Sequence, residues 1–275
     1  MTSSDFLKNY ETSEGTIRKL FDSKLRLAIL DALFERPMRL SDLRREVNAT
    51  APNTSSKAKE LEEMGVVERA EGDFQLTPYG QAVRKKMQDS FEFYATYEKF
   101  KEFWISRDLS GIPDYLFMRL GDLKKSEVVK STPTDISRVF DLFFEQVKSI
   151  KKFFYGVAGF YHKDYVEMAL ELARGGIKVG VVSTPEICNK IVNTVPKEKI
   201  KLFDKYVDSY ITNSVTIDMS VADSFFSINF INEQAEIKFL DSDLSSTDPR
   251  AIQWGLDLFE YYKKQARPVK LGDYL

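Results

Sequence analysis

The chain has 275 residues, enough for about two domains, and 43% of them are hydrophobic, as in an ordinary globular protein. Its net charge of −2 means that a nucleic-acid-binding surface would have to come from local basic clusters. A single cysteine, Cys188, excludes an internal disulfide and is typical of a reducing compartment. No apolar run approaches the roughly 18 residues of a membrane helix, and the polar N-terminus resembles no signal peptide. We therefore expect a cytoplasmic protein without a membrane span.

Basic and acidic residues are separated in the first third of the chain. Residues 18–59 hold ten lysines or arginines against five acids, whereas residues 60–73 hold six acids against Arg69 alone. This separation favours a basic face beside an acidic one, with a mosaic of solvated charges as the alternative.

The first elements expected are three helices. The run "SKLRLAILDALFE" carries Leu27, Leu30 and Phe34 at helical spacing, and "RLSDLRREVN" predicts a short helix after the break at "RPM". A third helix begins after Thr50 and ends before Gly65. Its inward side should be small and apolar, which leaves a polar outward side.

Two strand-like runs follow, at residues 66–69 and 74–76, on either side of "EGD". Thr77 then caps a helix that is expected to run to about Trp104. The order of helix, short helix, turn, helix and hairpin is that of a winged helix-turn-helix.

The third helix begins with small polar residues and ends with acids. A recognition helix enters the major groove by its first turns, so side chains there must be short and able to donate and accept hydrogen bonds. Asn53 and Ser56 meet both conditions, and Lys57 can reach a phosphate or a guanine edge. The acidic tip "EGD" argues against insertion of the wing tip into DNA. The candidate DNA contacts are Arg44, Arg45, Thr50, Asn53, Ser56, Lys57 and Arg69.

The helix after Thr77 is unusually aromatic in its second half. One stripe at helical spacing is accompanied by further aromatics off that stripe. These are Phe93, Tyr97, Phe100 and Trp104 on the stripe, and Phe91, Tyr94 and Phe103 off it. Because a helix on a single core needs only one stripe, two stripes predict burial against the second domain and against the partner of a homodimer. The alternative is a helix deep within one domain.

From about residue 110, β-rich runs alternate with helical patterns, which predicts an α/β domain with a mixed sheet. The runs "YITNSVTIDMSVADSFFSINFI" and "AEIKFLD" are typical of hairpin strands, and "PRAIQWGLDLFEYYKKQA" of a closing helix. The fold class expected is therefore α+β or α/β with two domains. We expect residues 1–90 to form a winged helix-turn-helix DNA-binding domain, 91–109 a long aromatic linker and dimerisation helix, and 110–275 a regulatory α/β domain.

The sequence offers little for catalysis. It has one histidine and one cysteine, and it lacks a G-x-S-x-G elbow, a P-loop and a G-x-G-x-x-G loop. The contiguous His162–Lys163–Asp164 does not match the spaced H-x-K-x-x-x-x-D of phospholipase D-like enzymes. We expect no enzymatic activity, no cofactor and no metal.

The run "YGVAGFYHKDY" ends a strand of the α/β domain, where small-molecule clefts tend to form. Its small residues can leave room for a ligand that its aromatic residues would cover. The candidate effector-binding residues are Tyr155, Phe160, Tyr161 and His162. The alternative is that the aromatics are core, the small residues allow close packing, and His162 is a structural group at a helix start.

These motifs resemble the archaeal winged-helix transcriptional regulators of the methanogenesis-regulatory (Fil) type over nearly the full length. "LSDLRREVN", "KELEEMGVVER" and "LTPYG" are shared with many winged-helix regulators. "DLSGIPDYLFMRLGDL", "FYGVAGFYHKDYVEMALELARGGIKVGVVST" and "WGLDLFEYYKKQA" are more specific to that family's C-terminal domain. The resemblance implies sequence-specific binding of double-stranded DNA by the first domain and a sensory or oligomerising role for the second.

Two other functions stay open. A winged helix can be a protein–protein interaction module without specific DNA binding, which the near-neutral charge and the acidic hairpin tip favour. It can also be an accessory domain of an enzyme, against which the lack of a catalytic constellation argues.

Overall fold

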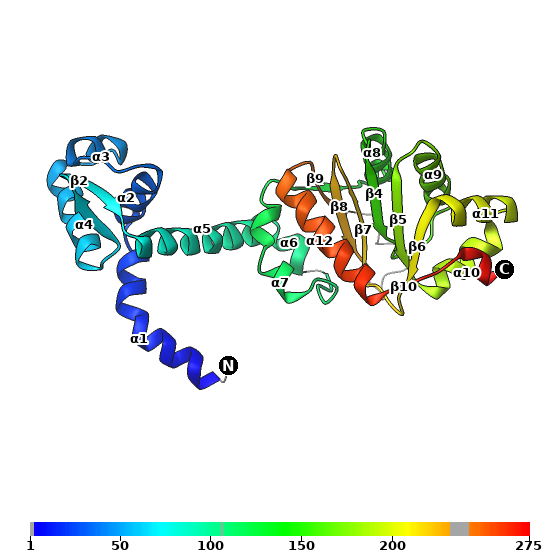
Figure 1. Cartoon of the computed structure of the whole chain (residues 1–275), viewed down its shortest axis with the longest axis horizontal. Coiled ribbons are helices and arrows are strands. Elements are labelled where there is room, and N and C mark those ends of the chain that lie inside the picture. The colour runs from blue at the N-terminus through cyan, green and yellow to red at the C-terminus, as the bar shows by residue number, and fades with distance from the viewer. Residues whose placement is uncertain (1–2, 106, 232–241) are drawn as a thin grey trace. The chain divides into compact units, whose positions relative to one another are not determined.

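The computed structural model describes residues 3–105, 107–231 and 242–275, and the chain divides into two compact units, Met1–Ser90 and Phe91–Leu275. Figure 1 gives the order of the elements. Within the described ranges, no helix combines the length and the apolar character that crossing a membrane requires.

The first unit consists of helices and one β-hairpin. Its elements are α1 (Ser3–Phe21), α2 (Lys24–Glu35), α3 (Leu40–Glu46), α4 (Ala51–Glu63), β1 (Val67–Ala70), β2 (Asp73–Leu76) and the first part of α5 (Pro78–Lys99). Apolar side chains at helical spacing close its core, with Leu30, Leu43, Leu61 and Phe74 almost completely buried. The three helices and the hairpin expected after Ser23 are therefore present in the predicted order.

The hairpin turn is tighter than the predicted strands at 66–69 and 74–76 imply. Ala70 pairs with Asp73, so Glu71 and Gly72 alone connect β1 to β2. Both turn residues have positive φ values, 53° and 91°. Positive φ at both positions is the requirement of a type I′ turn, which glycine meets without steric strain.

The aromatic helix differs from its prediction because it is interrupted at Phe100. Thr77 caps α5 by accepting a hydrogen bond from the Gly80 N–H at 3.0 Å, as expected, but α5 ends at Lys99 and a short α6 (Lys101–Ile105) follows. The interruption redirects residues 101–105, so that Phe103 and Trp104 both pack against Phe230, at 5.8 and 6.2 Å between ring centroids.

The core of the second unit thus takes up the whole predicted stripe and also Phe103, which was expected off it. Tyr94 is 65% exposed and Phe91 is 42% exposed. In this division, residues 91–109 belong with the C-terminal unit rather than forming a separate linker.

The second unit is built on a mixed sheet of eight described strands in the order β10-β6-β5-β4-β7-β8-β9-β3. The strands are β3 (Glu127–Lys130), β4 (Phe153–Val157), β5 (Lys178–Ser183), β6 (Val207–Ile211), β7 (Ile217–Ala222), β8 (Phe226–Phe230), β9 (Ser242–Ser246) and β10 (Arg267–Pro268). β4, β5 and β6 are parallel, and the other pairs are antiparallel. The mixed sheet is as predicted, while the predicted strand "AEIKFLD" lies outside the described residues.

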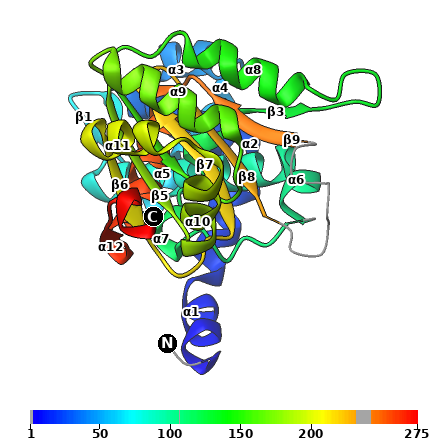
Figure 2. The ribbon, with the colours of Figure 1, turned by 90° about the vertical axis from the view of Figure 1, so that its right-hand side faces the viewer.

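Helices cover both faces of this sheet. One face carries α8 (Arg138–Val147), α9 (Lys163–Arg174), α10 (Pro185–Thr194), α11 (Lys197–Tyr206) and η3 (Leu271–Tyr274). The other face carries the end of α5, α6, α7 (Asp114–Phe117), η1 (Leu120–Leu123) and α12 (Pro249–Gln265). In Figure 2, α9, α10 and α11 lie in front of the strands. The sheet therefore separates two apolar cores, one beneath each layer of helices.

Candidate nucleic-acid interface and ligand pocket

The first half of α4 presents small polar side chains to solvent because its apolar side is buried. Thr54, Ala58 and Leu61 are completely buried in the core of the first unit. Asn53 and Ser56 are exposed on the remaining side. Helical spacing therefore places these two side chains where a groove could receive them.

Thr50 occupies the N-cap position of α4, as expected, but its side chain makes no capping hydrogen bond. Its backbone carbonyl instead accepts a hydrogen bond from the Thr54 hydroxyl at 2.9 Å. The Thr50 hydroxyl is therefore not used to cap the first turn of α4.

Lys57 is not a free cation. Its Nζ lies 2.6 Å from Oε1 of Glu60, and the nearly buried guanidinium of Arg26 donates to the other carboxylate oxygen of Glu60. The hydrogen bond from Lys57, with the one from Arg26, lowers the pKa of Glu60 despite its partial burial. Glu60, from the acidic second half of α4, thus holds Lys57 in place.

The three predicted arginines differ in their surroundings. Arg44 is exposed and has no ion-pair partner within the described ranges, whereas its neighbour Arg45 is paired with Asp42. Arg69 lies 3.3 Å from Glu62 and its guanidinium lies over the ring of Phe74, 4.4 Å from the centroid. Arg44 is therefore the predicted contact with the least competition from protein carboxylates.

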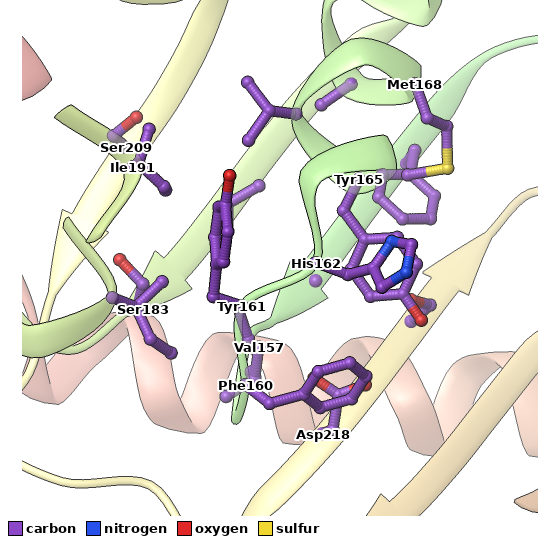
Figure 3. A pocket seen from close by; sticks show the side chains of 18 of the residues that line it. Val157, Phe160, Tyr161, His162, Tyr165, Met168, Ser183, Ile191, Ser209 and Asp218 are labelled. Carbon is purple, nitrogen blue, oxygen red and sulfur yellow. The ribbon is translucent and has the colours of Figure 1, made fainter. Parts of the chain in front are cut away.

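A cavity of about 80 Å³ lies in the second unit, where β4 ends and α9 begins (Figure 3). Phe160, Tyr161 and His162 line it, so three of the four candidate effector-binding residues meet at one site. The rest of the wall is mostly apolar, with Met168 from α9 and Ile191 from α10. Parallel strands end here beside an antiparallel neighbour, β7, which is the edge where ligand clefts form in α/β domains.

Tyr155 does not line this cavity, which corrects its grouping with the other three. Side chains alternate between the faces of a strand, and Phe154 and Gly156 line the cavity. Tyr155 therefore lies on the opposite face, where its ring stacks on Phe259 of α12 at 4.7 Å and 7°.

His162 has a structural role besides lining the cavity. Its Nδ1 accepts a hydrogen bond from the Asp164 N–H at 3.3 Å and so caps α9. Gly159 is likewise constrained by packing, because a Cβ there would lie 2.6 Å from the Ile217 carbonyl oxygen. A Cβ at Gly156 would meet only ordinary contacts, so Gly156 is the glycine that can leave room in the cavity.

Three residues of this region were not singled out from the sequence: Asp218, Asp243 and Tyr165. Asp218 lines the cavity and accepts a hydrogen bond from the Gly159 N–H at 2.9 Å. Burial, and then the charge of Asp243, raises the pKa of Asp218 to about 7. Burial also raises the pKa of Asp243 to about 7, although a hydrogen bond from Ser227 and the charge of Arg107 oppose the shift. Burial likewise raises the pKa of Tyr165.

A signal for Asp218 is present in the sequence. In "TIDMSVA", Asp218 alternates with buried apolar residues. An acidic residue in a strand that is covered on both faces is rare unless it is paired or binds something. That Asp243 lies close to Asp218 could not be predicted, because it depends on the order β7-β8-β9 of the sheet.

Comparison with known proteins supports the resemblance that the motifs indicate. Residues 136–265 match the family described as the middle domain of methanogenesis regulatory protein FilR1, and residues 14–98 match the HVO_A0261 N-terminal domain family. The chain is 20% identical over 262 residues to methanogenesis regulatory protein FilR1 of Methanothrix harundinacea, covering 94% of this chain. It spans 58% of that relative's length. The resemblance to the methanogenesis-regulatory type of protein is thus confirmed.

Two solved structures show weak likeness. TrmBL2, described as an archaeal chromatin protein with a novel mode of DNA binding, has 15% identity and a TM-score of 0.43, with 90% of this chain and 95% of that chain covered. NucT from Helicobacter pylori has 18% identity and a TM-score of 0.37, with 51% of this chain and 94% of that chain covered.

Proposed function

We propose that this chain, which resembles methanogenesis regulatory protein FilR1, is a transcription regulator that binds double-stranded DNA sequence-specifically. In this proposal the first unit is a winged helix-turn-helix and the second unit binds an effector. The family matches support the regulatory role, and the elements α2, α3, α4 and the β1–β2 hairpin support the DNA-binding domain.

The observation that carries the proposal is the polar first half of α4. Asn53 and Ser56 are exposed in the first two turns of a helix whose other side is buried. An asparagine can recognise adenine through two hydrogen bonds in the major groove, and a serine can donate to or accept from several base edges. We assign base contacts to these two residues, and backbone contacts to Arg44, Arg45, Thr50, Lys57 and Arg69.

Fluorescence anisotropy with DNA selected from genomic fragments tests this function. Asn53→Ala should weaken binding to the selected site by roughly 1–3 kcal/mol while leaving binding to unrelated DNA unchanged. The matched control is Lys59→Ala on the same helix, an exposed cation that we do not assign to a base. Equal binding of the wild-type protein to selected and random DNA at about 150 mM salt would contradict sequence specificity.

We also propose a homodimer, with α1 rather than the aromatic helix as the pairing element. Phe6, Tyr10 and Ile17 are spaced at i, i+4 and i+11 and fall on one face of α1. Their exposed fractions are 71%, 41% and 39%. By contrast, most of the aromatic side chains of α5 and α6 are already buried in the second unit.

The charges of α1 favour an antiparallel pair of two copies. Its first turn is acidic at Asp5 and its last turn is basic at Arg18 and Lys19. An antiparallel arrangement places the acidic end of each helix beside the basic end of the other. Two-fold symmetry makes such an interface self-complementary and would present two recognition helices to two half-sites.

The second candidate function is a protein–protein interaction module, and the acidic hairpin tip is the observation that favours it. Glu68 and Glu71 are exposed on the hairpin, where they would repel phosphates. Such a module would show no salt-dependent binding to DNA, so the anisotropy titration also separates these two functions.

A further inference from the structure

One face of the strands β7, β8 and β9 carries a row of polar side chains. Asp218 pairs with Asn229 across β7 and β8, and Ser220 pairs with Ser227, so all four point to the same face. Asp243 of β9 lines the same space. The alternate positions, such as Met219 and Ile228, face the apolar core on the other side. We call Asp218, Ser220, Ser227, Asn229 and Asp243 the polar floor.

Aromatic side chains cover this polar floor. Phe140 of α8, Phe160 and Tyr165 lie above it, with 6.5, 6.3 and 5.7 Å between the centroids of the pairs Phe140–Phe160, Phe140–Tyr165 and Phe160–Tyr165. A space of about 30 Å³ remains between the rings and the polar floor. It shares Phe160, Tyr165 and Asp218 with the apolar cavity of about 80 Å³ beside it.

The polar floor carries more negative than positive charge. Asp218 has no ion-pair partner in the described parts of the chain, and the only hydrogen bond to it there comes from the Gly159 N–H. Asp243 receives a hydrogen bond from Ser227, and the positive charge of Arg107 favours its ionised form. Among the described residues, Tyr165 also lines the space beside the polar floor, and the titratable side chains of Tyr161 and His162 line the adjoining apolar cavity. Burying carboxylates beside aromatic rings is costly unless a cation compensates them.

A second polar point lies in the wall of the apolar cavity. The Ser209 hydroxyl oxygen is buried and lacks a hydrogen-bond partner within the described ranges. Figure 3 shows Ser209 and Asp218 at different sides of the cavity. Buried hydroxyl groups are normally satisfied, so the Ser209 hydroxyl offers a hydrogen-bond partner to a ligand atom in the cavity.

We propose that this site binds a small organic cation, an alkylammonium whose charged head lies between Asp218 and Asp243 and whose tail occupies the apolar cavity. The carboxylates supply opposite charge, and the faces of Phe140, Phe160 and Tyr165 add cation–π attraction. Ser209 can satisfy a hydroxyl or amine at the far end of the tail. This inference rests on the proposed function, because it names the class of effector that the second unit would sense.

The aromatic and apolar lining of this site is unlike the lining of a metal site. Divalent cations such as Mg²⁺ and Ca²⁺ prefer six or more oxygen ligands and bound water. No group of three or more potential metal-ligating side chains occurs in the part of the chain that the structure describes. A single ammonium needs only a few acceptors and tolerates the apolar surroundings of its own tail.

Isothermal titration of the full chain at about pH 8, where both carboxylates are ionised, provides the test. The probes are n-pentylamine, 5-amino-1-pentanol and the neutral 1-pentanol. We expect binding of both amines, with the amino alcohol tighter than n-pentylamine because of Ser209, and at least tenfold weaker binding of 1-pentanol. Asp218→Asn should weaken amine binding at least tenfold.

Asp218→Asn keeps an oxygen for the Gly159 N–H, so the variant should fold, and its circular dichroism and melting temperature check this. The matched control is Asp208→Asn, which removes an exposed acid from β6 in the same sheet and should leave amine binding unchanged. Equal binding of amine and alcohol, equal amine affinity in Asp218→Asn and wild type, or stabilisation by Ca²⁺ instead of the amine would overturn the proposal.

The same samples are titrated with DNA so that the two proposals fail separately. Amine binding without specific DNA binding would refute the regulatory function and leave the cation site standing. Specific DNA binding without amine binding would refute the cation site alone. Where both hold, a change in DNA affinity on adding 5-amino-1-pentanol measures the coupling between the sites, which is typically about 5- to 150-fold.

Discussion

Arg44 and Arg45 are adjacent residues of α3 that differ in how their charge is compensated. Arg45 donates to Asp42, whereas Arg44 has no carboxylate partner in the described ranges. A cation that is already paired must give up that pair, or share it, when it contacts a phosphate. The free energy gained from DNA is therefore smaller for Arg45 than for Arg44.

We expect Arg44→Ala to lower the slope of log K against log[salt] by about 0.9, the value of one phosphate contact in duplex DNA. Arg45→Ala should change it less, because Arg45 is already paired with Asp42 and so neutralises a phosphate less completely than Arg44 does. Anisotropy titrations between about 50 and 200 mM salt measure both slopes. Identical slopes for Arg44→Ala and the wild-type protein would remove Arg44 from the interface.

The pKa of Asp218 predicts a pH dependence of folding stability. Burial, and then the charge of Asp243, raises this pKa from 3.8 to about 7. Between these values the folded protein holds a proton that the unfolded chain has lost. The contribution of Asp218 is thus complete below about pH 4 and disappears as the pH rises through 7.

Asp218→Asn should remove this dependence, since an amide does not titrate. We expect the fall in unfolding free energy between about pH 4.5 and 7.5 to be smaller in the variant by on the order of 1–2 kcal/mol, allowing for partial solvent exposure. Urea unfolding at several pH values measures it, with Asp208→Asn as the exposed control. Parallel curves for wild type and Asp218→Asn would mean that Asp218 titrates alike in both states.

At the scale of elements, local signals predicted the first unit well from α2 onward, whereas α1 was not predicted. The spacing of Leu27 and Leu30, the break before α3 and the presence of a turn at Gly72 all depend on near neighbours in the chain. The interruption of the aromatic helix at Phe100 could not be predicted in this way. No proline or glycine lies at the interruption. The side chains that follow it, Phe103 and Trp104, pack on Phe230, which is far away in the sequence.

The ligand pocket was predictable only in part for the same reason. The run 160–162 is contiguous, so its three side chains reach one place through local geometry. Tyr155 was misplaced because strand alternation decides its face, and the pattern around it is apolar on both faces. Asp218 and Asp243 meet through the order of three strands, two of which are joined by a segment outside the described residues.

At the scale of the whole molecule, the proposed regulator needs two recognition helices on one DNA. Half-sites of winged helix-turn-helix dimers are about 34–36 Å apart, one turn of the duplex, and a monomer can read only one of them. The proposed dimer interface of α1 must therefore form for tight binding to a palindromic site. The apolar face of α1 is exposed in the single chain, so its burial against a second copy would contribute to association.

Ile17→Asp should convert the dimer to a monomer, because it places a charge in the apolar face of α1. Tyr94→Asp on α5 is the matched control, since Tyr94 is even more exposed and lies on the helix that the sequence alone favours for dimerisation. Multi-angle light scattering at micromolar concentration gives the mass of each variant. We expect Ile17→Asp alone to halve the mass and to weaken binding to a two-half-site DNA at least tenfold, while leaving a single half-site unaffected. A monomeric Tyr94→Asp beside a dimeric Ile17→Asp would assign the interface to the aromatic helix instead, and a monomeric wild-type protein would exclude the dimer.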